Sequence, residues 1–188
     1  MSELPAGMPF PIGPEEQFSQ VMVYTPESLY WGSIILRKTI RVSTWLRTSA
    51  NPESIALYQA NTLRFDTSET RPHPYGEIHI PIDQVRIFHL MPPAQDPLDY
   101  DPTQPNLRLE PVTAQSGHYL VKGKLHMPVH GGINHYFSVN RVTFSGMYDV
   151  EISHSLRINM TPIRVPYVVI RVSTTVFATD TMNTDLIR

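Results

Sequence analysis

The chain has 188 residues, 17% of them charged, and a formal net charge of −2 at neutral pH. It contains no cysteine, which excludes disulfides, thiol nucleophiles and cysteine-based metal centres. So small a net charge does not favour polyanion binding by the whole molecule. Its 18 prolines exceed the usual share of about 5% and favour strands and loops over helices.

The N-terminal residues predict an extended tail over 1–13, followed by a short helix. Several prolines in the tail lack amide donors and have a fixed φ. Pro14, Glu15 and Glu16 fit the first turn of a helix, which accepts proline and favours acidic side chains. The N-terminus has no secretory leader pattern and no stretch is long and apolar enough to span a bilayer, so we expect a cytoplasmic protein without membrane contact.

Strand-type patterns, rich in β-branched and aromatic residues, follow through a predicted first repeat over 14–91. They lie at 21–25, 29–37, 41–46, 54–65 and 78–90. Gly32 interrupts the second of them and predicts a bend, a bulge or a close approach of two backbones. The next segment, 92–111, holds six of the 18 prolines and several aspartates, which is typical of a semi-rigid linker.

The pattern of the first repeat then returns over 112–178, before a C-terminal tail at 179–188. In the returning pattern Gly123 takes the place of Gly32. The segment INHYFSV, at 133–139, matches RVSTWL, at 41–46. The segment IRVPYVVIRV, at 163–172, matches IHIPIDQVRI, at 78–87, with Pro166 in the place of Pro81. Matches in the same order on both sides of a linker predict a duplicated domain.

The predicted fold class is mainly β, with two small antiparallel β-barrels in tandem, a short N-terminal helix and a proline-rich linker. About five short strands in about 70 residues favour a closed barrel, because closure removes exposed sheet edges. A period-two pattern at 146–156 supports half-buried antiparallel strands.

The first copy resembles the Sm-like (LSm) family. Residues 14–36, PEEQFSQVMVYTPESLYWGSIIL, fit its N-terminal helix and glycine-bearing strand, and residues 80–90, IPIDQVRIFHL, fit its closing strand. The resemblance covers 14–90, and more weakly 106–178, and implies Sm-like barrels. That family binds RNA through an Asp-x-apolar-Asn motif and an Arg-Gly pair. Here the corresponding positions are 41–46 and Pro81-Ile82, so no RNA-contacting residue carries over by identity.

A basic segment and two tryptophans are the candidate nucleic-acid contacts, since cations grip phosphates and aromatic rings stack on bases. The candidate residues are Arg37, Lys38, Arg41, Trp45, Lys122, Lys124 and Arg141. Residues 112–178 carry six Lys/Arg and two Asp/Glu, and the linker is acidic. The basic residues could therefore bind nucleic acid, bind the linker itself, or form an ordinary solvated strand face.

Three histidines, His126, His130 and His135, surround a Gly-Gly turn and are candidate zinc or nickel ligands. Pro128 prevents a helical ligand spacing and no carboxylate lies close in sequence, which favours structural or surface histidines. We expect no cofactor. Nucleophile-elbow, phosphate-loop and dinucleotide-binding motifs are absent, so we expect no enzyme activity.

The interpretation that best fits these patterns is a non-catalytic interaction or scaffolding protein. We expect it to self-associate through barrel edges into a closed homo-oligomer, such as a trimer with six barrels, and a protein partner is possible. The alternative is a nucleic-acid-binding Sm-like protein that uses the basic second repeat.

Overall fold

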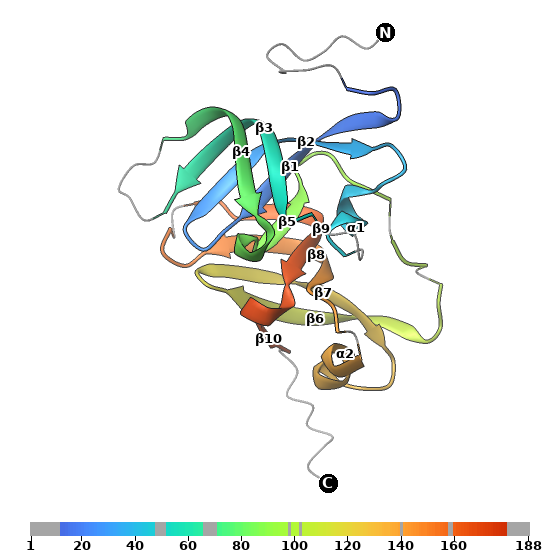
Figure 1. Ribbon diagram of the computed structural model, residues 1–188. Coiled ribbons are helices and arrows are strands. Elements are labelled where there is room, and N and C mark those ends of the chain that lie inside the picture. Colours follow the sequence, from blue (N-terminus) through green and yellow to red (C-terminus); the bar gives the residue numbers. More distant parts are fainter. Residues whose placement is uncertain are drawn as a thin grey trace. The chain divides into compact units, whose positions relative to one another are not determined.

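The computed structural model describes residues 12–47, 52–65, 71–97, 99–101, 103–139, 141–157 and 160–179 (Figure 1). The chain divides into two compact units, residues 1–99 and 100–188. Both are built from antiparallel strands, so the mainly β prediction is confirmed. Almost all of the predicted tails, 1–13 and 179–188, lies outside the described residues. Within the part of the chain that is described, no helix has the length and apolar character needed to cross a membrane.

Unit 1 forms an antiparallel sheet with the strand order β5-β1-β2-β3-β4. Its elements are β1 (Glu16–Tyr24), β2 (Ser28–Arg37), α1 (Val42–Trp45), β3 (Ser54–Arg64), β4 (His73–Pro81), the 3₁₀ helix η1 (Ile82–Gln84) and β5 (Ile87–Leu90). Alternate apolar side chains are removed from water along these strands, as in Val21 and Val23 of β1 and Ile55 and Leu57 of β3. Burial of this alternating set holds the sheet together.

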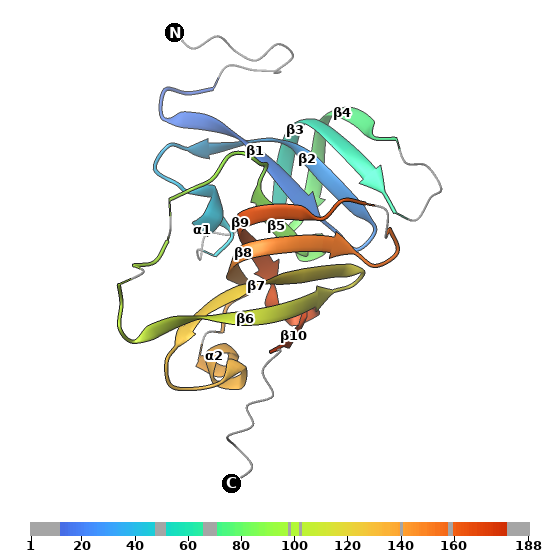
Figure 2. The ribbon, with the colours of Figure 1, turned by 180° about the vertical axis from the view of Figure 1, so that it is seen from behind.

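Unit 2 repeats this arrangement with the strand order β10-β6-β7-β8-β9 (Figure 2). Its elements are β6 (Leu107–Ser116), β7 (Tyr119–Pro128), α2 (Ile133–Val139), β8 (Phe144–His154), β9 (Ile163–Arg171), the 3₁₀ helix η2 (Val172–Thr174) and β10 (Val176–Ala178). Each unit thus has a helix between its second and third strands. Each also has a 3₁₀ helix before its fifth strand.

The spacing between equivalent elements is nearly constant. β2 begins at Ser28 and β7 at Tyr119, which is 91 residues later. β3 begins at Ser54 and β8 at Phe144, which is 90 residues later. The 3₁₀ helices begin at Ile82 and Val172, again 90 residues apart. The two halves of the chain therefore have a common topology.

The sequence match between Pro81 and Pro166 is wrong by five residues. Pro81 ends β4, whereas Pro166 lies inside β9, and the residue that ends β9 is Arg171. The true counterpart of IPIDQV, at 80–85, is IRVSTT, at 170–175. Two strands rich in β-branched residues match each other in several registers, so their patterns alone did not fix the alignment.

The predicted N-terminal helix is also wrong, because residues 14 and 15 form a turn and β1 begins at Glu16. The Glu16 carboxylate accepts a hydrogen bond from the Gly13 N–H at 2.7 Å and stabilises that turn. The proline and acidic residues that resemble a helix start therefore belong to a turn.

The linker is shorter than predicted, since β6 begins at Leu107.

The strands predicted at 41–46 and 133–139 are helices, although the sequence match between these two segments agrees with their equivalent places. In α1, Val42 is 2% exposed and Leu46, directly after the helix, is 0% exposed. A spacing of four residues puts both on one helical face, and that face is buried. Burial of a helical face therefore prevails over the strand propensity of valine and threonine.

A glycine opposite a β-bulge occurs at the same place in both units, which confirms the prediction made from Gly32. The ladder shifts register across Gly32 in β2 and across Gly123 in β7. The bulged residues opposite them, Gln59 and Asp149, have positive φ angles of 49° and 50°. A Cβ at either glycine would lie 2.9 Å from the carbonyl oxygen of Tyr58 or Tyr148. A side chain therefore does not fit at these two points.

Substitution of either bulge glycine by alanine should destabilise the protein. We expect Gly32→Ala and Gly123→Ala each to lower the free energy of unfolding by about 1–3 kcal/mol, because the added methyl group contacts backbone that cannot move aside. Gly76→Ala in β4 is the matched control, since a Cβ there meets nothing within 4 Å. Urea unfolding followed by circular dichroism measures the three differences, and a bulge variant as stable as the control would contradict this account.

Candidate functional site

The open edge of β4 is the most distinctive feature of unit 1. β4 ends the strand order of this unit, and β3 is its neighbour in the ladder. The Ile82 N–H donates to the Glu53 carbonyl at 2.9 Å and continues this ladder past the end of the strand. Because hydrogen bonding alternates along an antiparallel strand, Ile78 and Ile80 also direct their N–H groups toward β3. The intervening N–H groups, those of Glu77 and His79, point outward.

Pro81 occupies the next outward position. Proline lacks an N–H group, so a sheet tolerates it only where no ladder bond is required. At this position, Pro81 removes no hydrogen bond from the β3–β4 ladder. The proline therefore marks the outward side of β4 as an edge, and it limits the outward donors at this end of the strand to Glu77 and His79.

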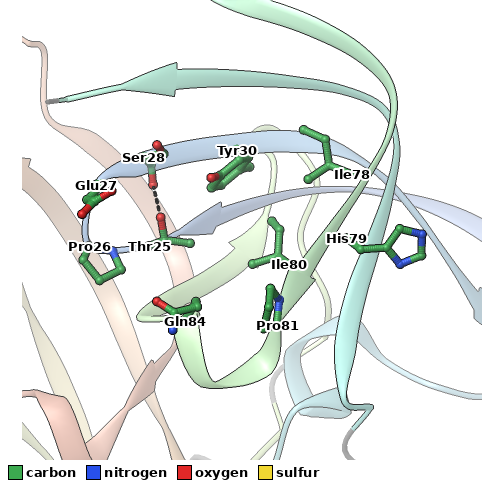
Figure 3. A pocket seen from close by; sticks show the side chains of 10 residues that line it. All are labelled: Thr25, Pro26, Glu27, Ser28, Tyr30, Ile78, His79, Ile80, Pro81 and Gln84. Atoms are coloured by element: carbon green, nitrogen blue, oxygen red, sulfur yellow. Dashed lines mark hydrogen bonds between the residues drawn. The ribbon is translucent and has the colours of Figure 1, made fainter. Parts of the chain in front are cut away.

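A pocket of about 230 Å³ lies beside this edge (Figure 3). It is lined by the β1–β2 turn, by Tyr30 of β2, by the end of β4 and by η1; the lining residues are Thr25, Pro26, Glu27, Ser28, Tyr30, Ile78, His79, Ile80, Pro81 and Gln84. Ile78 and Ile80 point toward Tyr30, and the ring of His79 points away from them. The turn is fixed by two bonds to the Ser28 carbonyl, from the Thr25 N–H at 2.9 Å and from the Thr25 hydroxyl at 3.2 Å.

The sheet of unit 1 must curl for this pocket to exist. β2 and β3 separate β1 from β4 in the strand order, yet the β1–β2 turn and β4 line the same pocket. No ladder joins β4 to β5 among the described residues, so the order stays open at β4. The result is a curled sheet with an edge at β4 and, next to it, a hollow lined by both polar and apolar side chains.

Two of the four predicted nucleic-acid contacts of unit 1, Lys38 and Trp45, contact other groups of the chain. Lys38 donates from Nζ to the Pro14 carbonyl at 2.6 Å. The Trp45 ring packs on the Phe88 ring, with centroids 5.9 Å apart, and is half-buried. Arg37, at the end of β2, and Arg41, before α1, are exposed. Trp45 therefore stabilises α1 and β5 rather than offering an open ring for base stacking.

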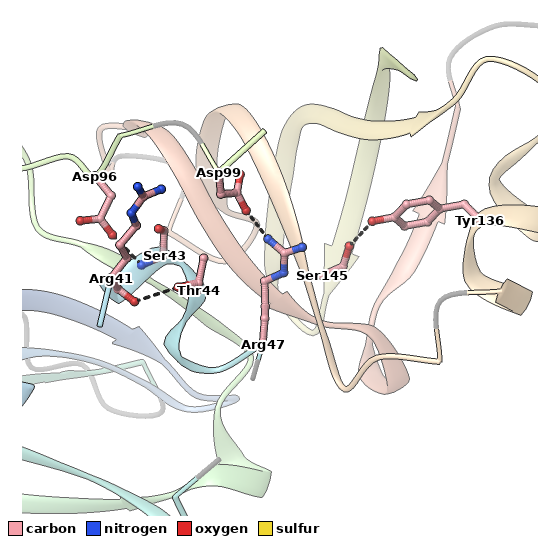
Figure 4. A network of polar contacts seen from close by, with 8 residues as sticks. All are labelled: Arg41, Ser43, Thr44, Arg47, Asp96, Asp99, Tyr136 and Ser145. Carbon is pink, nitrogen blue, oxygen red and sulfur yellow. Dashed lines mark hydrogen bonds and ion pairs between the residues drawn. The ribbon is translucent and has the colours of Figure 1, made fainter. Parts of the chain in front are cut away.

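Acidic residues of the predicted linker bind the basic segment around α1 (Figure 4). The Ser43 N–H donates to Asp96 Oδ2 at 2.7 Å, and Arg47 forms an ion pair with Asp99, whose side chain is 8% exposed. The N-cap residue, Arg41, makes no side-chain capping bond. Asp96 therefore supplies, from 53 residues along the chain, the acceptor that an N-cap side chain usually provides.

The candidate cations of unit 2 lie apart or face carboxylates. Lys124 binds Asp149 at 2.8 Å. Lys122 pairs in register with Glu151, which accepts an ion pair from Arg164 at 2.7 Å. Arg141 is exposed and lies between α2 and β8. Charges of both signs thus alternate across β7, β8 and β9, as on a solvated strand face.

The candidate metal ligands do not converge. His126 lies against the rings of Tyr100 and Tyr148, with centroids 4.3 and 6.2 Å away. His130 and His135 are exposed, the first in the turn after β7 and the second in α2. Within the described parts of the chain, no three His, Cys, Asp or Glu residues are grouped so that they could hold a metal ion.

In the same region, the Tyr136 hydroxyl lies 3.1 Å from Ser145 Oγ and ties α2 to β8 (Figure 4).

A buried tyrosine–histidine pair links β1 to β5, and no sequence pattern indicated it. His89 is 2% exposed; its Nδ1 lies 2.7 Å from the Leu90 carbonyl, and its Nε2 lies 2.9 Å from the Tyr24 hydroxyl. A carbonyl only accepts, so Nδ1 carries the proton and Nε2 accepts from Tyr24. Burial lowers the pKa of His89 to about 4, although its bond to Leu90 opposes that shift, and burial raises the pKa of Tyr24.

Comparisons of this chain with protein-family models, with curated proteins and with solved structures gave no match.

His89 should make the protein less stable in mild acid. The unfolded side chain titrates near pH 6.5 and the folded one near pH 4, so between these values the unfolded chain binds a proton that the folded chain does not. Stability is fully present above pH 6.5 and falls by about 3 kcal/mol as the pH decreases to 4. Urea unfolding at several pH values measures this slope. His89→Phe should reduce it, and an unchanged slope in that variant would contradict the assignment.

The Asp96 contact should stabilise unit 1. We expect Asp96→Ala to lower the free energy of unfolding by about 1 kcal/mol, because it removes the acceptor for an α1 backbone N–H. Asp101→Ala is the control, since that carboxylate accepts from Thr103 at 2.6 and 2.8 Å and not from α1. Urea unfolding monitored by tryptophan fluorescence compares the two variants. Equal stabilities would show that the linker contact contributes nothing.

Proposed function

We propose that this protein is a non-catalytic interaction or scaffolding protein that assembles by joining β4 of one copy to β10 of another. Each unit is then a small, incompletely closed Sm-like barrel, and the chain carries two in tandem. The curl of unit 1 and the shared order of elements in the two units support this proposal. So does the glycine in the second strand of each unit, because it allows the sharp bend that such a barrel needs.

The observation that carries the proposal is the edge of β4 with its adjoining pocket. Proteins that bind an added strand use main-chain hydrogen bonds for affinity and pockets for alternate side chains for specificity. β4 has both features, since Glu77 and His79 present outward N–H groups and the pocket begins at Ile78 and Ile80.

β10 is the strand that fits this edge. It ends the strand order of unit 2, it is short, and its Val176 is 70% exposed. Residues 1–99 carry seven Lys/Arg and 11 Asp/Glu, so unit 1 has a net charge of −4. Residues 100–188 carry eight Lys/Arg and six Asp/Glu, so unit 2 has a net charge of +2. Opposite charges favour unit 1 of one copy meeting unit 2 of the next. A contact between two different edges closes into a ring when the rotation allows, for example in a trimer.

The nucleic-acid alternative has less support. Lys124 binds a carboxylate, Lys38 binds a carbonyl, and Trp45 is packed against Phe88. These contacts involve three of the seven candidate residues, including the candidate stacking ring.

The proposal predicts that a proline at the outward position of β4 weakens assembly. His79→Pro removes an outward N–H and leaves the inward bonds of Ile78 and Ile80 in place. His79→Ala removes the same side chain and keeps the N–H. Sedimentation equilibrium over a range of concentrations should show wild type and His79→Ala assembling alike, and His79→Pro weakened by about ten-fold.

Two outcomes would overturn the proposal. One is a wild-type protein that stays monomeric at every concentration. The other is a His79→Pro protein that assembles as wild type does, with its strand content shown by circular dichroism to be intact.

A further inference from the structure

We propose that the pocket beside β4 is a receptor for one side chain of a second copy, that of Val176. This inference rests on the proposed function and adds to it the residue that determines which strand is accepted. The pocket supplies an apolar wall from Ile78, Ile80 and Pro81, with the Tyr30 ring beside it (Figure 3). A hollow of about 230 Å³ accommodates a branched aliphatic side chain.

The packing of β10 indicates which of its three side chains can enter the pocket of another copy. That side chain is Val176. The Phe177 ring lies on the Phe137 ring of α2, with centroids 4.6 Å apart, so Phe177 is committed to its own unit. Side chains alternate along a strand, so Val176 and Ala178 lie on the face opposite to Phe177. Val176 is the larger of these two and is 70% exposed. An exposed valine on a sheet edge gains free energy when a partner removes it from water.

The face of β4 determines where such a side chain goes. Ile78 and Ile80 lie on one face of the strand, and the pocket opens on that face. A strand added to the edge of β4 continues the pleat, so every second side chain of that strand lies on the same face, next to Ile78 and Ile80. One of those side chains is then at the mouth of the pocket.

Pro81 limits how far an added strand can pair at the end of β4 beside the pocket. β4 offers the outward N–H groups of Glu77 and His79, and then the donors end at Pro81. A long added strand would leave carbonyl groups without donors beyond Pro81. β10 has three residues and is bounded on one side by Thr175, whose N–H already bonds to the Val172 carbonyl at 3.2 Å. The end of β4 at Pro81, which adjoins the pocket, therefore accepts a strand as short as β10.

Aspartate at position 176 tests the role of the side chain. Val176→Asp should weaken assembly by about ten-fold or more, because it places a carboxylate against the apolar wall of a pocket that Glu27 also lines. Leu156→Asp is the matched control, since Leu156 is 63% exposed in the same unit and lies outside β10. It should assemble as wild type does. Gln84→Trp, which fills the pocket from its rim, should weaken assembly as Val176→Asp does.

Cross-linking tests the contact directly, because the chain has no cysteine of its own. A Gln84→Cys protein is mixed with a Val176→Cys protein and treated with a short bismaleimide. We expect a covalent heterodimer, and none when Leu156→Cys replaces Val176→Cys in the mixture. A heterodimer of mixed single-cysteine chains can only arise between copies.

The outcomes separate this inference from the proposed function. If His79→Pro weakens assembly but Val176→Asp and Gln84→Trp do not, and no specific cross-link forms, the edges pair without the pocket and this inference is wrong. If the wild type does not assemble at all, both are wrong. If all three variants weaken assembly and the cross-link is specific, Val176 is the residue that the pocket selects.

Discussion

The close approach of backbone to glycine at two β-bulges is the constraint on which the rest of the structure depends. Gly32 and Gly123 let the carbonyl of the neighbouring strand come within a distance that excludes any side chain. A bulge bends and twists its strand, so the sheet of unit 1 curls instead of lying flat. The curl brings β4 toward the β1–β2 turn and creates the pocket between them. Without this bend, the edge of β4 would be a flat strand with no hollow beside it.

The two units keep one topology but differ in what stabilises it. In unit 1, Asp96 and Asp99 hold α1 and a buried hydrogen bond joins Tyr24 to His89. In unit 2, contacts between aromatic rings stabilise the fold. For example, the Phe137 ring packs on the Phe177 ring. The backbone frame of the repeat therefore tolerates very different side chains around it. Different side chains make the terminal strands of the two units unequal, which is the condition for an interface between unlike edges.

Part of this was predictable from the sequence. A glycine within a strand pattern has few explanations, so the bulge at Gly32 could be foreseen, and period-two patterns gave the β class. The helices α1 and α2 could not be predicted, because four to seven residues are too few to distinguish a period of 3.6 from a period of two. In α1, burial of Val42 decided the outcome. Binding of the acidic linker was one of several alternatives for the basic residues, and the sequence did not indicate the segment around α1 as its partner. The edge of β4, its pocket and the pairing of Tyr24 with His89 depend on strand order, which no local pattern contains.

Pro81 has a consequence for solubility. An exposed edge strand is a template on which chains can polymerise without limit, and natural sheets interrupt such edges with charges or prolines. The missing donor of Pro81 interrupts a growing ladder after the N–H groups of Glu77 and His79, at the end of β4 beside the pocket. In the proposed assembly, the residue that limits the contact at this edge also opposes unlimited strand addition.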